Sequence, residues 1–295
     1  MTASPPVQIG ETLVLHGADL LRWRDGTSAA DPADIAAMRL LDWPVAISFD
    51  QSPPDLAWLH KPGETALWRR PTQDMVRGLA TDADRQRPAP TPFELRGTVV
   101  DTMGRFQPRR FALTPGGEIG HDLVLYPSPQ GTRFGSGGGL TGSLRLDLLQ
   151  GHLPDANAEP PPDPFLLGPR RQAAWALVEV AVAVGDGDVR RFRAQTNAFG
   201  DFRLSLWRLP PLPAGTPFYP AELSVQAALT ALDHAPLDPS ELAAMHLAVV
   251  PPAAPIPLPE DDDAFAPALP LNLVPGAVQR VPAAAPHQLA LRPSP

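Results

Sequence analysis

Acidic residues form the densest group of potential metal ligands or catalytic acids in this chain of 295 residues, in which Glu260, Asp261, Asp262 and Asp263 stand next to one another. A calcium loop alternates its oxygen ligands with other residues, places a Gly at the turn and closes with a Glu. Neither that Gly nor that Glu follows Asp263. The pattern therefore favours a solvated acidic patch, and we predict no metal site and no cofactor.

Histidine supplies no recognisable metal motif, because no two histidines stand in an H-x-H or H-x-x-x-H arrangement. His121 and Asp122 are a conceivable metal-binding or acid/base pair, but an isolated histidine in a loop is more often structural. The seven histidines are His16, His60, His121, His152, His234, His246 and His287.

The glycine-rich stretch Gly131 to Gly142 has the composition of a phosphate-binding loop but lacks its lysine, since Lys61 is the only lysine in the chain. We expect a flexible loop there. The chain has no Cys, which excludes disulfides and thiolate catalysis, and no G-x-S-x-G nucleophile elbow occurs. We predict no catalytic residue, and we expect a protein that is not an enzyme.

The stretch from Ala173 to Leu206 organises the chain. Its valines (Val178, Val180, Val182, Val184) alternate with other residues at the period of a β-strand, and Trp175, Leu177 and Glu179 fall on the opposite face. Residues 185–188 (G-D-G-D) predict a hairpin turn, and residues 197–201 (N-A-F-G-D) predict a second tight turn before Phe202, Leu204 and Leu206 alternate inward. We expect three consecutive antiparallel strands with short connections.

The second of these turns carries a family resemblance. Thr196-Asn197-x-x-Gly200-x-Phe202-x-Leu204 resembles the signature of carboxypeptidase-regulatory-like (transthyretin-like) β-sandwich domains. The segment 93–104 (F-E-L-R-G-T-V-V-D-T-M-G) is similar to the opening G-x-V-x-D-x-x-G of the same family. The resemblance implies a β-sandwich; because the two pieces lie about a hundred residues apart, it implies either a long insertion or two sandwiches.

Three regions are expected along the chain. Residues 1–90 form a mixed, mostly β module, residues 91–235 form the β-sandwich, and residues 236–295 form a short helix and a proline-rich extended tail. A polar, proline-rich segment at residues 82–92 has the character of a linker, and residues 154–169 are predicted to be an exposed insertion.

Within the first region, the pattern predicts a strand over 11–16, a helix that Asp31 caps and that reaches residue 41, a strand over 44–49, and a hairpin of 56–59 with 65–69. Its four tryptophans are interpreted as core or interface anchors, with a sugar-stacking platform as the alternative. They are Trp23, Trp43, Trp58 and Trp68.

Within the other two regions, short strands are predicted near residues 93–101, 123–126, 143–148 and 222–227. The segment 238–247 repeats the capped-helix pattern of 31–40, so it too is predicted to be helical. Prolines recur every few residues from 249 to 295, with isolated apolar side chains between them. We expect an extended arm or disorder there, and deletion of residues 249–295 is expected to leave the fold nearly intact but to abolish assembly.

Composition excludes several classes of function. The net charge of −8 and a pI near 5.3 argue against a nucleic-acid binder. Residues 1–9 lack the pattern of a signal peptide, and the longest apolar run, residues 173–184, is too short to span a membrane. We therefore expect a soluble protein that is made in the cytoplasm, without membrane insertion and without a nucleic-acid partner.

The fold class predicted is mainly β: antiparallel β-sandwich modules with a few short helices and extended proline-rich terminal arms. Arginine almost replaces lysine and Ala and Pro are abundant, which is typical of a GC-rich bacterial genome. With these features the chain resembles accessory proteins of phage tails and contractile injection systems. The resemblance implies a non-enzymatic structural component of a large assembly, bound to protein subunits in multiple copies and carried in a virion or injection-system particle. The alternatives are a carbohydrate- or surface-binding β module and an accessory domain of an enzyme complex.

Overall fold

The computed structural model describes residues 19–69, 93–115, 120–147, 170–185, 187–229, 236–250, 265–283 and 287–294. Strands dominate this part of the chain, and its only helical segments are two three-residue 3-10 turns, η1 (Ile35–Ala37) and η2 (Pro239–Glu241). The predicted mainly β fold is confirmed. None of the helical segments in these ranges has the length or the apolar character of a membrane span.

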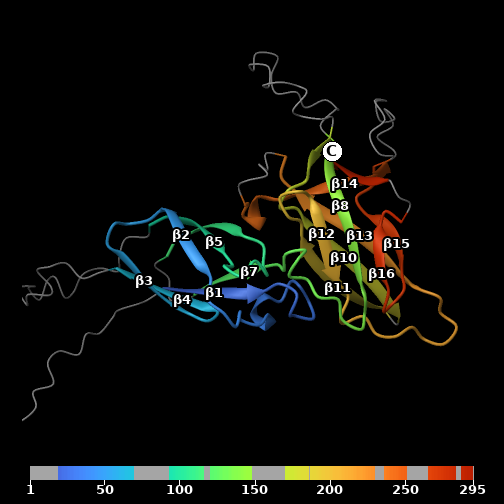
Figure 1. Cartoon of the computed structure of the whole chain (residues 1–295), viewed down its shortest axis with the longest axis horizontal. Coiled ribbons are helices and arrows are strands. Elements are labelled where there is room, and N and C mark those ends of the chain that lie inside the picture. The colour runs from blue at the N-terminus through green and yellow to red at the C-terminus, as the bar shows by residue number, and fades with distance from the viewer. Residues whose placement is uncertain are drawn as a thin grey trace, which may run out of the picture.

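The first seven strands form what we call the N-terminal lobe, residues 19–126, at one end of the molecule (Figure 1). One sheet has the order β3-β4-β1-β7 and a second has the order β2-β5-β6. All pairs are antiparallel except β1 with β7, which is parallel. The strands are β1 (Asp19–Asp25), β2 (Ala46–Gln51), β3 (Leu56–Lys61), β4 (Glu64–Arg69), β5 (Leu95–Val100), β6 (Arg109–Leu113) and β7 (His121–Leu125).

Side chains from both small sheets pack into one core, which gives the lobe a sandwich-like arrangement. Leu21 and Trp23 of β1 meet Val99 of β5 and Phe111 of β6, and the rings of Trp23 and Phe111 lie edge to face with centroids 6.1 Å apart. The predicted hairpin of β3 and β4 is confirmed. Its turn needs Gly63, which has φ +72° and whose Cβ would lie 2.7 Å from the Leu40 Cβ.

Strand pairing in this lobe crosses the boundary predicted after residue 90. Strands β5 and β7, from the region expected to begin the second module, pair with β2 and β1 of the first. The change of sheet comes after β7 instead, in the segment that leads to β8. The predicted strand at 11–16, the linker at 82–92 and the insertion at 154–169 lie outside the described residues.

The remaining strands form one large sheet, which we call the C-terminal lobe (residues 139–293). In the described ranges its main path is β11-β10-β13-β14-β17-β8-β12, with β15 added to β13, and β9 and β16 added to β8. The strands are β8 (Gly139–Asp147), β9 (Arg170–Gln172), β10 (Leu177–Gly185), β11 (Asp188–Gln195), β12 (Asp201–Ser205), β13 (Tyr219–Ala227), β14 (Ala243–Val250), β15 (Leu269–Leu273), β16 (Val278–Val281) and β17 (Gln288–Pro293).

The valine-rich strand occupies the predicted central position. Strand β10 pairs with β11 on one side and with β13 on the other, and Val178, Val180 and Val182 are fully buried. The turn at 197–201 also forms as predicted: Asn197 Oδ1 accepts hydrogen bonds from the backbone N–H groups of Phe199 and Asp201, and Gly200 has φ +76°. Trp175 differs from the prediction, because it precedes the strand in a left-handed conformation with φ 61°.

The three consecutive strands with short connections are present as β10, β11 and β12, but the third does not continue the antiparallel pairing of the first two. Strand β12 pairs with β8, not with β11. Although β11 and β12 lie at the two ends of the path, they contact each other, because the sheet rolls around a single core. Phe192 of β11 and Phe202 of β12 lie in that core with Leu223 and Leu291. The inward alternation was therefore predictable, whereas the pairing partner was not.

The predicted C-terminal arm is corrected, because its described residues contain β15, β16, β17 and the end of β14. Strand β17 lies between β14 and β8, and its Leu289, Ala290 and Leu291 are fully buried. The prolines are accommodated at permissive places: Pro270 is in β15, which has only one described neighbour, β13, and Pro293 ends β17.

Both predicted helices shrink to 3-10 turns. Asp34, not Asp31, caps η1 by accepting a hydrogen bond from the Ala37 N–H, and the chain is extended again at Met38. Asp238 caps η2 as the pattern suggested, but residues 243–250 then form β14. Pairing of β14 with β13 and β17 outweighs the weak helical preference of an Ala-rich segment.

The glycine-rich stretch is not a flexible loop. Residues 139–142 begin strand β8, and the glycines before it permit close backbone contact. A Cβ at Gly137 would lie 1.7 Å from the Leu206 carbonyl oxygen, and one at Gly138 would lie 2.1 Å from the Ala277 oxygen. Glycine is therefore needed here for packing between neighbouring chain segments.

Candidate functional site

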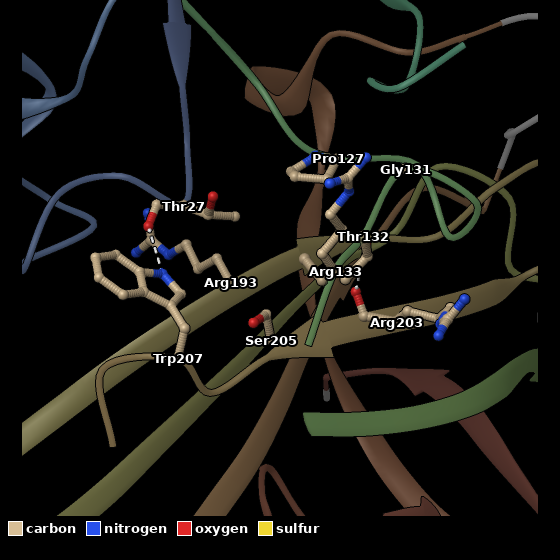
Figure 2. A pocket seen from close by; sticks show the side chains of 10 residues that line it. Thr27, Pro127, Gly131, Thr132, Arg133, Arg193, Arg203, Ser205 and Trp207 are labelled. Carbon is tan, nitrogen blue, oxygen red and sulfur yellow. Dashed lines mark hydrogen bonds between the residues drawn. The ribbon is translucent and has the colours of Figure 1, made fainter. Parts of the chain in front are cut away.

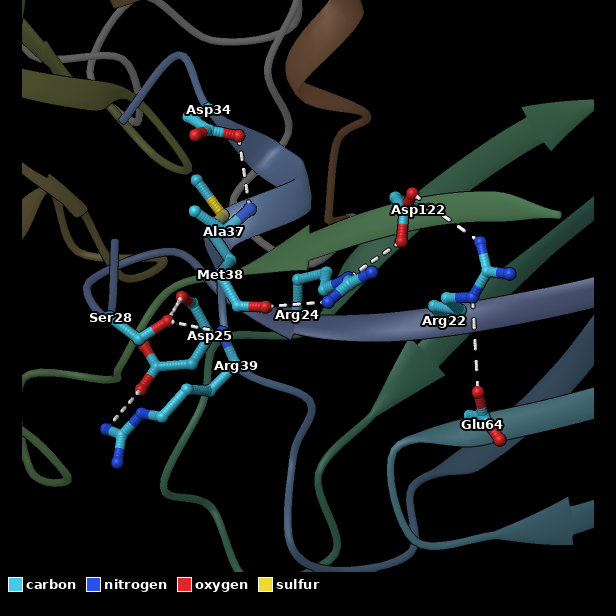
Figure 3. A network of polar contacts seen from close by, with 10 residues as sticks. All are labelled: Arg22, Arg24, Asp25, Ser28, Asp34, Ala37, Met38, Arg39, Glu64 and Asp122. Atoms are coloured by element: carbon cyan, nitrogen blue, oxygen red, sulfur yellow. Dashed lines mark hydrogen bonds and ion pairs between the residues drawn. The ribbon is translucent and has the colours of Figure 1, made fainter. Parts of the chain in front are cut away.

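The pair His121 and Asp122, considered for metal or acid/base chemistry, lies on β7, and Asp122 is engaged in ion pairs (Figure 3). Its carboxylate accepts a 2.7 Å hydrogen bond from Arg24 Nε and lies 3.8 Å from Arg22 Nη1. Arg24 also donates to the Met38 carbonyl oxygen at 2.7 Å. The carboxylate thus attaches the η1 segment to the sheet, which is a structural role.

The same network continues around the turn after β1. Ser28 Oγ donates to the Asp25 carbonyl oxygen and accepts from the Arg39 N–H, both at 2.7 Å, while the Arg39 guanidinium lies 3.7 Å from the Asp25 carboxylate (Figure 3). These bonds fix the segment that carries Met38 against the lobe.

Several of the other sequence candidates lie in parts of the chain whose placement the structure does not describe. Residues 260–263 lie outside the described residues, as do His16, His152 and His234. No group of three or more His, Cys, Asp or Glu side chains that could hold a metal ion occurs in the described ranges.

The structure instead concentrates polar and apolar contacts at the junction of the two lobes. Arg109 of β6 donates to the Val124 carbonyl oxygen at 2.8 Å and to Asp238 Oδ1 at 3.2 Å. The side chains of Arg109 and Asp238 are only 13% and 9% exposed, so this ion pair is buried. Beside it, the Arg110 N–H donates to the Leu237 carbonyl oxygen at 3.3 Å.

A second chain of contacts crosses the junction through Arg193 of β11. Its Nε donates to Glu179 Oε2 of β10 at 2.6 Å, and its Nη1 donates to the Pro32 carbonyl oxygen at 3.3 Å. The Tyr126 hydroxyl, in the residue that follows β7, lies beside Arg193. Farther along the junction, Trp207 Nε1 donates to the Thr27 carbonyl oxygen at 3.4 Å.

Burial shifts the pKa values of the groups at the junction. It lowers the pKa of Arg109, and the neighbouring Asp238 carboxylate opposes that change. It raises the pKa of the Tyr126 hydroxyl, against the influence of Arg193. Burial alone would lower the pKa of Arg193, but its bond to Glu179 and the charges of Tyr126 and Glu179 raise the value overall. Burial therefore disfavours ionisation of the Tyr126 hydroxyl, whereas the Glu179 carboxylate favours the charged form of Arg193.

Apolar packing surrounds these polar contacts. Met38, Val124 and Tyr126 of the N-terminal lobe form a small core with Leu177 of β10, and Leu242 packs against it. Each lobe thus contributes side chains to a shared core, which packs the two lobes against each other.

Next to this junction is a cavity of about 100 Å³ between the lobes (Figure 2). The segment that leads from β7 to β8 forms one wall, and strands β11 and β12 form the other. The lining residues are Thr27, Pro127, Gly131, Thr132, Arg133, Arg193, Ala194, Arg203, Ser205 and Trp207.

Sequence reasoning missed the junction, because its partners are distant in the chain: 129 positions separate Arg109 from Asp238. The Asp-Pro-Ser-Glu segment that begins at Asp238 predicts a helix cap, but a local pattern does not indicate that the aspartate also pairs with a buried arginine.

Comparison of the chain with known protein families, curated proteins and solved structures finds no match.

Proposed function

We propose that this protein is a non-enzymatic structural and interaction component of a larger bacterial or phage assembly, of the kind that forms caps, collars or baseplate accessories in phage-tail-like contractile injection systems. The observation that carries the proposal is the buried junction. A ligand-binding hinge usually leaves a mobile, wet interface between its domains, whereas this junction contains a desolvated ion pair and a shared apolar core. A rigid connection of this kind suits a structural subunit that holds neighbouring subunits in fixed positions.

Exposed apolar side chains at an open sheet edge support a role in contacts with other subunits. Strand β3 pairs only with β4 among the described residues, so its outer edge presents unpaired backbone groups. Trp58 and Leu59 on this strand are 44% and 54% exposed. Large exposed apolar residues beside an unpaired edge are typical of surfaces that other chains cover.

We further propose that the chain contains two β-sandwiches that resemble carboxypeptidase-regulatory-like domains, one in each lobe. Its two motifs fall in different lobes, one on β5 and the turn after it, the other on the turn before β12. In each motif a polar side chain holds the turn. The Asp101 carboxylate accepts hydrogen bonds from the backbone N–H groups of Met103, Arg105 and Phe106. In the other lobe, the Asn197 side chain accepts hydrogen bonds from backbone N–H groups of its own turn. Both motifs thus hold turns of the fold.

The proposal is tested by purifying a tagged chain from its native cell under mild conditions and analysing the eluate by gradient sedimentation and electron microscopy. We expect sedimentation with a large particle in several copies per particle. The variants Trp58→Ser and Leu59→Ser should fold but leave the particle, while Val189→Ser, which changes an exposed apolar residue of the other lobe, should remain in it. Recovery of the wild-type chain only as a small species would contradict the proposal.

A carbohydrate-binding role is the second candidate, and the exposed Trp58 favours it. Its ring lies against Phe49 with centroids 5.0 Å apart, so a rigid aromatic surface is available for a sugar to stack on. A saturable change in tryptophan fluorescence with glycans that Trp58→Ser abolishes would support this role. It would count against a purely structural function.

A further inference from the structure

The cavity between the lobes has rigid walls. The wall formed by the segment between β7 and β8 is attached to the N-terminal lobe through Ser128. The Ser128 N–H donates to the Arg105 carbonyl oxygen at 2.7 Å, and Ser128 Oγ donates to the Gly104 oxygen at 2.6 Å. The Gly131 N–H donates back to Ser128 Oγ at 2.9 Å. Thr132 Oγ1 donates to the Ser128 carbonyl oxygen at 2.8 Å and lies 3.3 Å from the Arg203 carbonyl oxygen of the other lobe. A ligand here meets a preformed site that exists only when the lobes are docked.

The charged side chains that line the cavity are all arginines, in a chain whose net charge is −8. Arg203 donates to the Pro129 carbonyl oxygen at 3.2 Å, its guanidinium lies 4.6 Å from the centre of the Phe134 ring, and in Figure 2 it points away from the cavity. Arg193 is paired with Glu179, although its charge remains at the cavity wall. Arg133 is exposed and makes no hydrogen bond or ion pair with any described residue. The cavity therefore carries uncompensated positive charge.

A buried hydroxyl at the cavity also lacks a partner. Ser205 Oγ is inaccessible to bulk solvent and has no hydrogen-bond partner among the described residues. Buried polar atoms are almost always hydrogen-bonded, because an unmet donor or acceptor loses its hydration without replacement. Figure 2 shows Ser205 between Arg193 and Thr132, so an occupant of the cavity is the group that can complete its bonding.

We propose that this cavity binds a single tetrahedral oxyanion, namely phosphate or the phosphoryl group of a small phosphate ester. Arg133 supplies charged N–H donors, Arg193 supplies those that its bonds to Glu179 and Pro32 leave free, and the Ser205 hydroxyl supplies a neutral one. Guanidinium groups suit this ligand, because their fork of N–H donors matches the spacing of its oxygens. The volume of about 100 Å³ is far below the roughly 300–1,000 Å³ of sites for whole cofactors, so only the anionic group enters. A bound oxyanion would contact both lobes and stabilise their junction.

Thermal unfolding and isothermal titration calorimetry test the proposal, with inorganic phosphate and O-phosphoserine as probes and chloride and acetate at equal ionic strength as controls. We expect saturable heat and a rise in Tm with phosphate, because a ligand that binds only the folded state stabilises it. Binding of O-phosphoserine as well would identify the phosphoryl ester as the ligand class, and binding of phosphate alone would identify the free anion. Equal effects of phosphate and chloride would overturn the proposal.

Two variants and a matched control sharpen the test. Arg133→Gln should fold normally and weaken phosphate binding about tenfold, since it removes one charge-assisted donor. Ser205→Ala should also weaken binding, but without phosphate its stability should be unchanged or higher, because the unpartnered hydroxyl is gone. Arg96→Gln removes an equal charge from an exposed site and should bind like the wild type. Unchanged affinity in both cavity variants would show that phosphate binds elsewhere and would reject the site.

Discussion

Each lobe is built from β-strands around a core of its own, but the two lobes differ in which parts of the chain they require. The N-terminal lobe takes all its strands from one stretch, residues 19–125, which ends well before the C-terminal lobe begins. The C-terminal lobe places its last strand, β17, in the middle of the sheet between β14 and β8. Its core therefore cannot close until the end of the chain is present, and bringing strands so far apart in the sequence together costs loop-closure entropy first.

The largest effect is expected from removing that last strand. Deletion of residues 287–295 should unfold the C-terminal lobe, because it exposes the edges of β14 and β8 and removes three fully buried side chains. Limited proteolysis and near-ultraviolet circular dichroism measure the loss. A deletion variant with native spectra and unchanged protease resistance would restore the interpretation of this segment as an arm.

A second effect is expected within the C-terminal core. Phe202→Ala should lower the free energy of unfolding by about 3–5 kcal/mol, because it leaves a cavity among fully buried neighbours. Phe199, three residues earlier, is 63% exposed, so Phe199→Ala should change it by less than about 0.5 kcal/mol. Chemical denaturation of both variants checks the difference, and equal midpoints would place Phe202 outside the core.

The stability of the junction between the lobes should depend strongly on one carboxylate, that of Asp238. Asp238→Ala should destabilise the protein by about 3 kcal/mol, because it leaves the buried Arg109 guanidinium without its counter-charge. The control is Asp188→Ala, which breaks an exposed pair with Arg190 and should cost at most about 1 kcal/mol. Similar losses in the two variants would show that the junction pair is solvated.

These contrasts also explain what the sequence could and could not predict. The period of two in residues 178–182, the turn at Asn197 and the hairpin of β3 and β4 are local properties, and each was predicted. The partner of β12 and the place of β17 depend on packing between segments far apart in the chain. Arg109 and Asp238 illustrate the same limit for the site, because neither residue carries a pattern that names the other.

The smallest effect is expected in the N-terminal lobe, at His60. Burial lowers the pKa of His60 below its usual 6.5, and its Nδ1 lies 2.9 Å from Thr65 Oγ1, which also accepts a bond from Trp23 Nε1. The unfolded chain therefore takes up this proton at a higher pH than the folded one. Stability should be complete above pH 6.5 and should fall slightly as the pH drops through the lowered pKa. In His60→Gln this part of the pH dependence should vanish, whereas an unchanged profile would assign it to other groups.

The rigid connection of the two lobes is the central claim, and spin-label distance measurement tests it most directly. The chain has no Cys, so Met103→Cys in one lobe and Val278→Cys in the other, at positions 62% and 54% exposed, give a doubly labelled protein without further changes. We predict one narrow distance distribution, which Asp238→Ala broadens. A broad or two-peaked distribution in the labelled protein without Asp238→Ala would contradict the account.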